Sequence, residues 1–296
     1  MLPVRQIGAC ALAVAALSAC SVVATVPYDE ALALQYVRWV GVSYCSARAI
    51  ETWTCKPCAA PTVPLTRVTY LFNATSNVTG VVGFSASTTE VVVAFRGTIG
   101  VEEWLEDFDI SMVPAAQSLA ANATCAGCLV SKGFSVDTYA SIRGQLAAAV
   151  RATLAAAPAA SARVVVLGHS LGAAIAEVAT FDLLAQGFPV AAHYSFGTPR
   201  VGNAAWAAAW AAAVDAAGAA HFRIVHNLDL VPRLPPNVVF GFVHPPREVF
   251  YNENQSAFTL CDAANGEDPA CSDADTDFKL SDHDVYLNRT LGTTVC

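Results

Sequence analysis

The sequence predicts an α/β fold with a mostly parallel central sheet, helices on both faces and a short helical lid. Three observations carry this prediction. Apolar stretches of strand length alternate with stretches of helix length, a pattern typical of a parallel sheet covered on both faces. One strand runs directly into a Gly-x-Ser-x-Gly turn and a helix. The 296 residues are 55% hydrophobic and only 14% charged, which provides for a large core.

The first half of the chain is expected to contain two helices and three strands. Apolar residues spaced by four indicate the second of these helices, and Pro158 ends it. The expected elements are a helix at 28–44, strands at 67–72, 78–85 and 90–95, and a helix at 141–157.

The second half alternates strands and helices more regularly, and glycines close two of its helices. The expected elements are a strand at 164–167, a helix at 171–186 closed by Gly187, a strand at 190–196, a helix at 204–217 closed by Gly218, a strand at 221–225 and a further one near 248–251.

The most informative segment is Gly168-His169-Ser170-Leu171-Gly172. Four apolar residues precede it and a helix rich in alanine and leucine follows, which is the context of the nucleophile elbow of an α/β-hydrolase. There Ser170 is the nucleophile, and the backbone N–H of Leu171 at the helix start faces developing negative charge. An inert serine in a glycine-rich turn is the alternative interpretation.

A serine hydroxyl needs a general base and an acid that orients the base. In this fold they follow the serine in the order acid, then histidine. Asp229 follows the strand at 221–225, and His283 lies in a polar loop near the chain end. Spacing alone leaves His244 open as a rival base, and both Asp229 and His283 could be ordinary loop residues.

Two further segments have a chemical interpretation. Thr98 follows the strand at 90–95, where its N–H and hydroxyl can serve as a second oxyanion donor. The lid is expected beyond it, because apolar residues there share one helical face and acidic residues lie off that stripe. The stripe consists of Val101, Trp104, Leu105 and Phe108. Periodicity alone also fits an ordinary surface helix.

Charge and the N-terminus limit the possible partners. The net charge is −8 and no basic block is present, so nucleic-acid binding has no electrostatic basis. Residues 1–26 are expected to be a signal peptide, because Arg5 is the only early charge and residues 7–26 carry none. An uncleaved anchor and lipoprotein-type cleavage at Cys20 are alternatives. Five Asn-x-Ser/Thr sequons favour a eukaryotic secretory route, so we expect an extracellular protein.

Eight cysteines follow the signal segment, an even number that indicates disulfides in a secreted chain. Proximity in sequence suggests three pairs, which leaves the first of the eight cysteines to pair with the last. The expected pairs are Cys55–Cys58, Cys125–Cys128, Cys261–Cys271 and Cys45–Cys296. A zinc site built from the two C-x-x-C arms is the rival interpretation.

Six motifs in a fixed order make the chain resemble the secreted fungal-type class 3 lipase family, which includes triacylglycerol lipases, feruloyl esterases and phospholipases. The resemblance covers about residues 30–290. Because the chain shows no internal repeat or long linker, we expect residues 27–296 to form one domain. Ser131-Lys132 and the alanine-rich stretch at 112–123 depart from the family pattern. The motifs lie at 95–98 with Trp104 following, 125–134, 168–172, 196–203, 223–236 and 282–287.

The resemblance implies the roles that spacing left open. It implies Ser170 as nucleophile, Asp229 as orienting acid and His283 rather than His244 as base. It implies Thr98 and Leu171 as oxyanion donors and the segment around Trp104 as lid, and it supports the cysteine pairing.

The expected function is hydrolysis of acylglycerol esters at a transient lipid–water interface by a monomer without a stable membrane span. Acyl transfer by a triad needs no metal or organic cofactor, so none is expected. The alternatives are a feruloyl or other polysaccharide-ester esterase, a phospholipase A1, and a non-catalytic secreted glycoprotein that binds lipid or a host partner.

Overall fold

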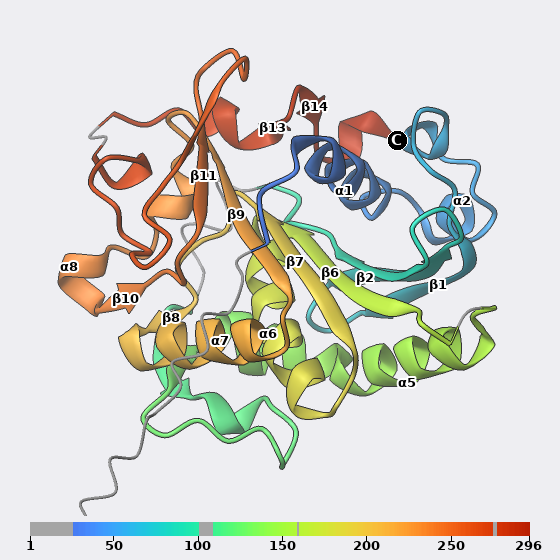
Figure 1. The fold of residues 1–296 in the computed structure, drawn as a ribbon, viewed down its shortest axis with the longest axis horizontal. Coiled ribbons are helices and arrows are strands. Elements are labelled where there is room, and N and C mark those ends of the chain that lie inside the picture. Colours follow the sequence, from blue (N-terminus) through green and yellow to red (C-terminus); the bar gives the residue numbers. More distant parts are fainter. Residues whose placement is uncertain (1–25, 101–108, 159, 275–276) are drawn as a thin grey trace, which may run out of the picture.

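An eight-stranded sheet forms the centre of the structure, a computed structural model that describes residues 26–100, 109–158, 160–274 and 277–296 (Figure 1). The strand order is β1-β2-β3-β6-β7-β9-β11-β12. The strands from β3 to β11 pair in parallel, whereas the outer pairs β1–β2, β2–β3 and β11–β12 are antiparallel. The strands are β1 (Thr66–Asn73), β2 (Val78–Ser85), β3 (Glu90–Phe95), β6 (Arg163–His169), β7 (Val190–Phe196), β9 (Ala220–His226), β11 (Glu248–Tyr251) and β12 (Phe258–Leu260).

Helices cover both faces of this sheet, which confirms the predicted fold class. In Figure 1, α1 lies on one face and α5, α6 and α7 lie on the other. A short α2 follows α1, and α4 with a π-helical stretch at Ser135–Tyr139 precedes α5. The helices are α1 (Glu30–Val42), α2 (Ala47–Glu51), α4 (Lys132–Phe134), α5 (Ala140–Ala156), α6 (Leu171–Ala185), α7 (Ala204–Ala216) and α8 (Asn237–Phe240).

The two faces carry separate cores because neighbouring strand residues point in opposite directions. On β6, Val164 and Val166 pack in the core beneath α5, α6 and α7. Val165 and Leu167 of the same strand pack in the core beneath α1. A strand buried on both faces therefore contains a continuous apolar run, which is the pattern that predicted it.

A second sheet of four very short strands lies beside the main one and was not predicted. Its order is β10-β8-β5-β4, and each strand has only two or three residues. Segments this short show no periodicity. These strands are β4 (Met112–Pro114), β5 (Leu129–Ser131), β8 (Gly202–Asn203) and β10 (Phe242–Val243), and a separate pair is formed by β13 (Val285–Tyr286) and β14 (Arg289–Thr290).

Disulfides close the described chain at four places. Cys45–Cys296 joins the segment after α1 to the C-terminus across 251 residues, and the other three bonds close short loops. These are the pairs that proximity in sequence suggested, and they leave none of these eight thiols free to bind zinc. The remaining bonds are Cys55–Cys58, Cys125–Cys128 and Cys261–Cys271. Within the described residues, no helix is both long and apolar enough to cross a membrane.

Buried polar side chains fix the position of α6, the helix that follows Ser170. Trp206 Nε1 on α7 donates to Glu177 Oε1 on α6 at 2.7 Å, and Trp210 Nε1 donates to the Glu177 carbonyl oxygen at 2.8 Å. Glu177 is buried. Burial raises the pKa of its carboxyl to about 8, although the Trp206 hydrogen bond and the Arg223 charge oppose the rise.

We expect Glu177 to make the stability of the fold depend on pH. Its pKa is raised in the folded state, so between its usual value of 4.5 and about 8 the folded state holds more protons than the unfolded state. This contribution to stability is complete below pH 4.5 and is lost as the pH rises through 8. In Glu177→Gln this loss should disappear, as measured by melting temperature between pH 5 and 9. The exposed Glu51→Gln is the control, and an unchanged wild-type slope in Glu177→Gln would disprove the assignment.

Candidate active site

Ser170 lies on a tight turn between β6 and α6. Its φ of 57° and ψ of −131° are rare for a residue with a side chain. The turn requires glycine on both sides: a Cβ atom on Gly168 would lie 2.2 Å from the Gly172 carbonyl oxygen, and one on Gly172 would lie 2.4 Å from the Phe95 carbonyl oxygen. The Ser170 N–H donates to the Phe196 carbonyl oxygen at 3.0 Å, which fixes the turn to the end of β7.

Asp229 and His283 form a buried pair. His283 Nδ1 donates to Asp229 Oδ2 at 2.8 Å and lies 3.0 Å from Oδ1, and both side chains are fully buried. The Val231 N–H donates to Oδ1 at 2.9 Å, and the Tyr286 hydroxyl also donates to Oδ2. Burial by itself raises the pKa of Asp229, but the His283 charge and these donors outweigh burial and leave the pKa below its usual value. Asp229 is therefore an ionised, firmly held acceptor.

The segments that carry this pair are joined to each other. The Asp282 carboxylate accepts from Asn227 Nδ2 at 2.6 Å and from the Leu228 N–H at 3.3 Å, and the Lys279 N–H donates to the Leu228 carbonyl oxygen at 2.8 Å. The loop after β9 and the short helical turn Leu280–Asp284 therefore keep Asp229 and His283 in register.

His169, the residue before Ser170, holds the His283 segment against the elbow. The two imidazole rings stack with centroids 4.5 Å apart, and His169 Nε2 lies 2.8 Å from the His283 carbonyl oxygen. Burial and the charge of His283 lower the pKa of His169 to about 3, so its ring is neutral. Because a carbonyl only accepts, Nε2 carries the proton and Nδ1 is an acceptor.

Tyr44 extends this contact to the end of β3. Its hydroxyl donates to His169 Nδ1 at 2.5 Å and accepts from the Gly97 N–H at 3.0 Å. A continuous chain of buried hydrogen bonds thus runs from Gly97 through Tyr44 and His169 to the backbone of His283. The sequence predicted no role for Tyr44 or His169. The signals it contains are the position of His169 within the elbow and that of Tyr44 beside Cys45.

Three buried polar atoms of the candidate site are unpaired. Within the described residues, Ser170 Oγ, His283 Nε2 and Thr98 Oγ1 are buried without a hydrogen-bond partner. No hydrogen bond therefore joins Ser170 Oγ to His283 Nε2 here; such bonds are often long in unliganded enzymes and tighten when substrate binds.

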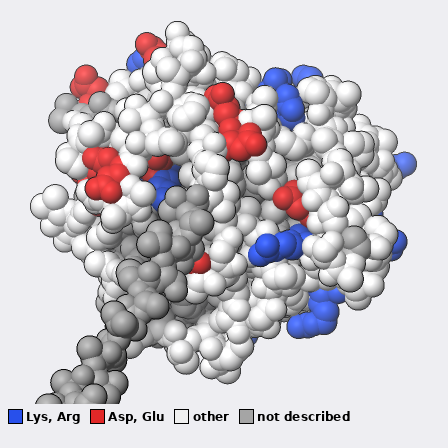
Figure 2. All heavy atoms as spheres, viewed as in Figure 1, with Lys and Arg blue, Asp and Glu red and all other residues white. Residues whose placement is uncertain are grey.

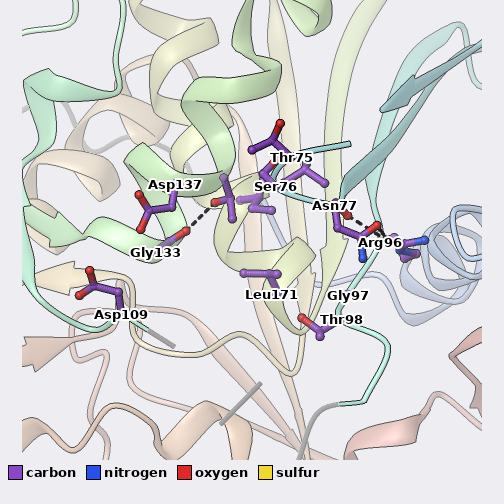
Figure 3. A pocket seen from close by; sticks show the side chains of 13 residues that line it. Thr75, Ser76, Asn77, Arg96, Gly97, Thr98, Asp109, Gly133, Asp137 and Leu171 are labelled. Atoms are coloured by element: carbon purple, nitrogen blue, oxygen red, sulfur yellow. Dashed lines mark hydrogen bonds between the residues drawn. The ribbon is translucent and has the colours of Figure 1, made fainter. Parts of the chain in front are cut away.

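Thr98 and Leu171 line a cavity of about 380 Å³ beside the elbow (Figure 3). Val78 and Ile175 contribute apolar surface to the same cavity. Figure 3 labels Leu171, Gly97 and Thr98 among the residues around it. The predicted lid residues Val101, Trp104, Leu105 and Phe108 lie outside the described residues.

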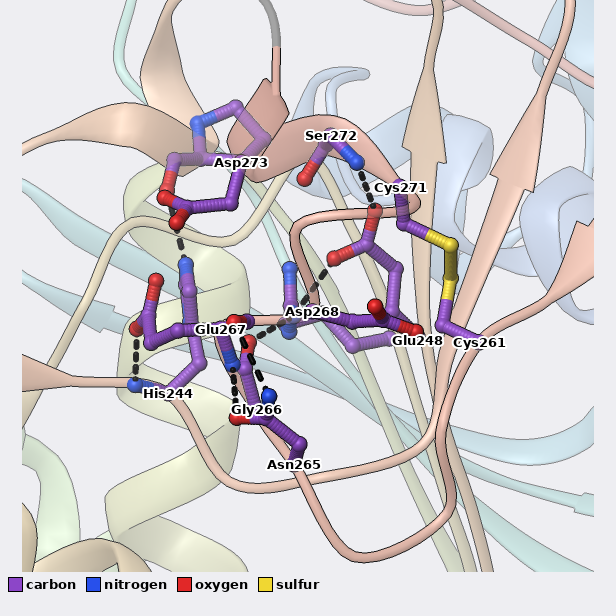
Figure 4. A network of polar contacts seen from close by, with 12 residues as sticks. His244, Glu248, Cys261, Asn265, Gly266, Glu267, Asp268, Cys271, Ser272 and Asp273 are labelled. Carbon is purple, nitrogen blue, oxygen red and sulfur yellow. Dashed lines mark hydrogen bonds and ion pairs between the residues drawn. A yellow bond between two sulfur atoms is a disulfide. The ribbon is translucent and has the colours of Figure 1, made fainter.

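The rival base His244 takes part in a different network (Figure 4). Its Nε2 donates to the Pro232 carbonyl oxygen at 2.7 Å, and its backbone N–H donates to Glu267 at 2.8 Å. Burial, together with the charges of Arg223 and Arg200, lowers the pKa of His244 well below its usual value. The structure therefore places His283, and not His244, against Asp229.

The network in Figure 4 supports the Asp229 loop from outside. Arg200 forms an ion pair with Glu267 at 2.6 Å, and its Nη1 donates to the Arg233 and Pro235 carbonyl oxygens at 2.5 and 3.2 Å. Glu248 lies close to the sulfurs of Cys261 and Cys271, but those sulfurs are bonded to each other, so this group offers no metal site.

Comparisons with known proteins point to one family. A family model described as lipase (class 3) matches residues 92–239. The secreted mono- and diacylglycerol lipase A of Penicillium cyclopium is 30% identical over 266 residues, which are 87% of this chain and 77% of that protein. Phospholipase A1-II 1 of Oryza sativa subsp. indica is 34% identical over 159 residues, 49% of this chain and 39% of that protein. A solved triacylglycerol lipase, whose catalytic centre is described as a serine protease triad, superposes with a TM-score of 0.75 at 27% identity, covering 88% of this chain and 94% of that chain.

We expect Tyr44→Phe to destabilise the protein and to lower its ester-hydrolysing activity. The change leaves the buried Gly97 N–H and His169 Nδ1 without partners, which costs about 1–3 kcal/mol in free energy of unfolding. Denaturant unfolding and turnover of a soluble ester measure the two effects. Tyr70→Phe is the matched control, because the Tyr70 hydroxyl makes one long contact of 3.4 Å to Thr79. Equal stability of the two variants would contradict the proposed hydrogen-bond chain.

Proposed function

The chain belongs to the class 3 lipase family of carboxylic ester hydrolases, and we propose that it hydrolyses acylglycerols with Ser170 as nucleophile, His283 as general base and Asp229 as orienting acid. One observation carries this assignment: a fully buried Asp229–His283 pair is held against the elbow that bears Ser170. We set aside the alternative of a non-catalytic lipid-binding glycoprotein, because the chain belongs to a family of enzymes.

The proposed reaction uses the unpaired atoms described above. Ser170 Oγ attacks the ester carbonyl carbon while His283 Nε2 takes the hydroxyl proton. Asp229 fixes the tautomer through Nδ1–H and stabilises the imidazolium. His283 then protonates the leaving alkoxide, and water attacks the acyl-enzyme in a second round with His283 again as base.

Thr98 and Leu171 are the proposed oxyanion donors. The Leu171 N–H begins α6, where the helix dipole favours negative charge. Thr98 follows β3 and has a buried hydroxyl without a partner among the described residues. Removal of one such donor typically lowers turnover by about 10²–10³-fold.

The cavity supports an uncharged acyl substrate. Val78, Leu171 and Ile175 give it apolar surface. Its charged lining residues are Asp109, Asp137 and Arg96, and Lys132 pairs with both aspartates, so the charges around the cavity balance and favour neither a cationic nor an anionic head group. The name of the Penicillium relative also points to acylglycerols. Phospholipase A1 activity is the second candidate, and the partial match to the rice phospholipase supports it. No contact among the described residues of the cavity specifically favours a feruloyl ester.

We also propose that the mature protein is secreted and works as a monomer without a cofactor. Four disulfides suit an oxidising compartment, and the Penicillium relative is named as secreted. The asparagines of four sequons are exposed: Asn77, Asn122, Asn254 and Asn288. The face shown in Figure 2 carries scattered charges and no continuous basic patch, as expected for a protein that does not bind nucleic acid. Residues 1–25 lie outside the described residues.

Replacement of Ser170 tests the nucleophile. Ser170→Ala should reduce ester hydrolysis by about 10⁶-fold and abolish covalent labelling by an alkyl phosphonate, because no other group at the turn can form the acyl-enzyme. The exposed Ser87→Ala serves as control. Hydrolysis by a folded Ser170→Ala protein at more than a hundredth of the wild-type rate would show that the nucleophile lies elsewhere.

Substrate preference is measured by initial rates on emulsified triacylglycerol, a zwitterionic phospholipid and a feruloyl ester. We expect the highest rate on triacylglycerol and a jump in rate above its solubility limit, which also tests the lid predicted from the sequence. Phospholipid as the best substrate would establish the second candidate. A flat profile across the solubility limit would refute the lid prediction.

A further inference from the structure

Exposed apolar side chains gather on the segments that carry the proposed active site. Nine large hydrophobic residues are exposed in the described part of the chain, and five of them lie on three such segments. Ile99 follows Thr98, Phe278 precedes His283 by five residues, and three consecutive residues follow Asp229 on the connection from β9 to β10. These three are Val238, Val239 and Phe240, here called the α8 tip.

The α8 tip is the most exposed apolar segment among these residues. Val238, Val239 and Phe240 are 98%, 71% and 48% exposed. In Figure 1, α8 projects from the side of the molecule, at the left of the view. Full exposure of a valine is unfavourable in water, and three adjacent exposed apolar residues indicate a surface that another phase or molecule covers.

The base of the tip is rigid. The Arg200 N–H donates to the Leu234 carbonyl oxygen at 2.7 Å, and Arg200 Nη1 donates to the Pro235 carbonyl oxygen. On the other side, Gly241 ends the helix with a φ of 70° and β10 pairs with β8. The exposed side chains are therefore presented by a fixed scaffold that also holds Asp229.

The chain on either side of the tip carries no charged residue. Residues 234–246 contain no Asp, Glu, Lys or Arg. Arg233 before this stretch is nearly buried, and Arg247 after it is paired with Asp215 at 2.8 Å. Residues 234–246 therefore offer no cation to attract anionic lipid head groups, and the net charge of −8 opposes such groups.

We propose that the α8 tip inserts into the surface of a neutral acylglycerol phase and anchors the protein there through the connection that also carries Asp229. This proposal rests on the proposed function. A second copy of the chain fits less well, because a stable dimer buries about 800 Å² per partner and one helical turn with three apolar side chains provides far less. A lipid surface accepts apolar side chains without a complementary shape.

The test is binding of the mature chain to triolein droplets in the Ser170→Ala background, so that hydrolysis does not alter the surface. Val238→Ser/Val239→Ser should weaken adsorption by about tenfold or more, because two apolar side chains lose their transfer into lipid. Val238→Leu/Val239→Leu should bind at least as well as the parent. Phe72→Ser is the control, because Phe72 is 43% exposed on β1 at the opposite edge of the sheet.

A second measurement separates anchoring from catalysis. With Ser170 present, Val238→Ser/Val239→Ser should hydrolyse a water-soluble short-chain ester at the wild-type rate and emulsified triolein more slowly at low droplet area. Unchanged adsorption, or an equal loss in Phe72→Ser, would overturn the proposal. The proposal would also fall if the parent protein sediments as a dimer and Val238→Ser/Val239→Ser sediments as a monomer. If the wild-type protein does not hydrolyse the soluble ester at all, that result would instead refute the proposed function.

Discussion

The backbone of Ser170 is the constraint on which the site depends. A positive φ at a residue with a side chain costs about 1–3 kcal/mol and persists only where neighbours enforce it. Here the Ser170 N–H is held by Phe196 at the end of β7, and α6 begins at the next residue. Gly168 and Gly172 let strand and helix meet at distances that no Cβ atom permits. The largely buried α6 packs against the sheet and fixes the turn, so the packing of helix and sheet offsets the cost of this backbone conformation.

The elbow also organises the other half of the site. His169 is neutral because it is buried beside His283, and that neutrality gives its two nitrogens opposite roles. One accepts from Tyr44, which in turn holds Gly97, and the other donates to the His283 backbone. The end of β3, the elbow and the His283 segment thus share one hydrogen-bond chain. A displacement of any of the three leaves a buried polar group unpaired, which makes the arrangement stiff.

The central elements could be predicted because each has a local cause. The apolar runs of β3 and β6, the glycines of the elbow and the period of α5 are signals within a few residues of sequence. The partners of Ser170 have no such signal: spacing left His244 open, and only the resemblance to a family favoured His283. Tyr44 was missed because its bonds reach residues 53 and 125 positions away. The strands of the second sheet were missed because two or three residues cannot show a period.

The distribution of unsatisfied polar atoms argues for function independently of any motif. Buried groups without partners are uncommon because each costs free energy, so native proteins retain them mainly where a ligand or water completes them. Within the described residues, Ser170 Oγ, Thr98 Oγ1 and His283 Nε2 are unpaired in the same region. These are the atoms to which the proposed reaction assigns the nucleophile, an oxyanion donor and the base. A second group, His221 and Arg223, lines a space of about 10 Å³, which suits one water molecule and no substrate. Thr98 of the first group lines the cavity of about 380 Å³, which has room for a substrate, so the space available distinguishes this group from the second.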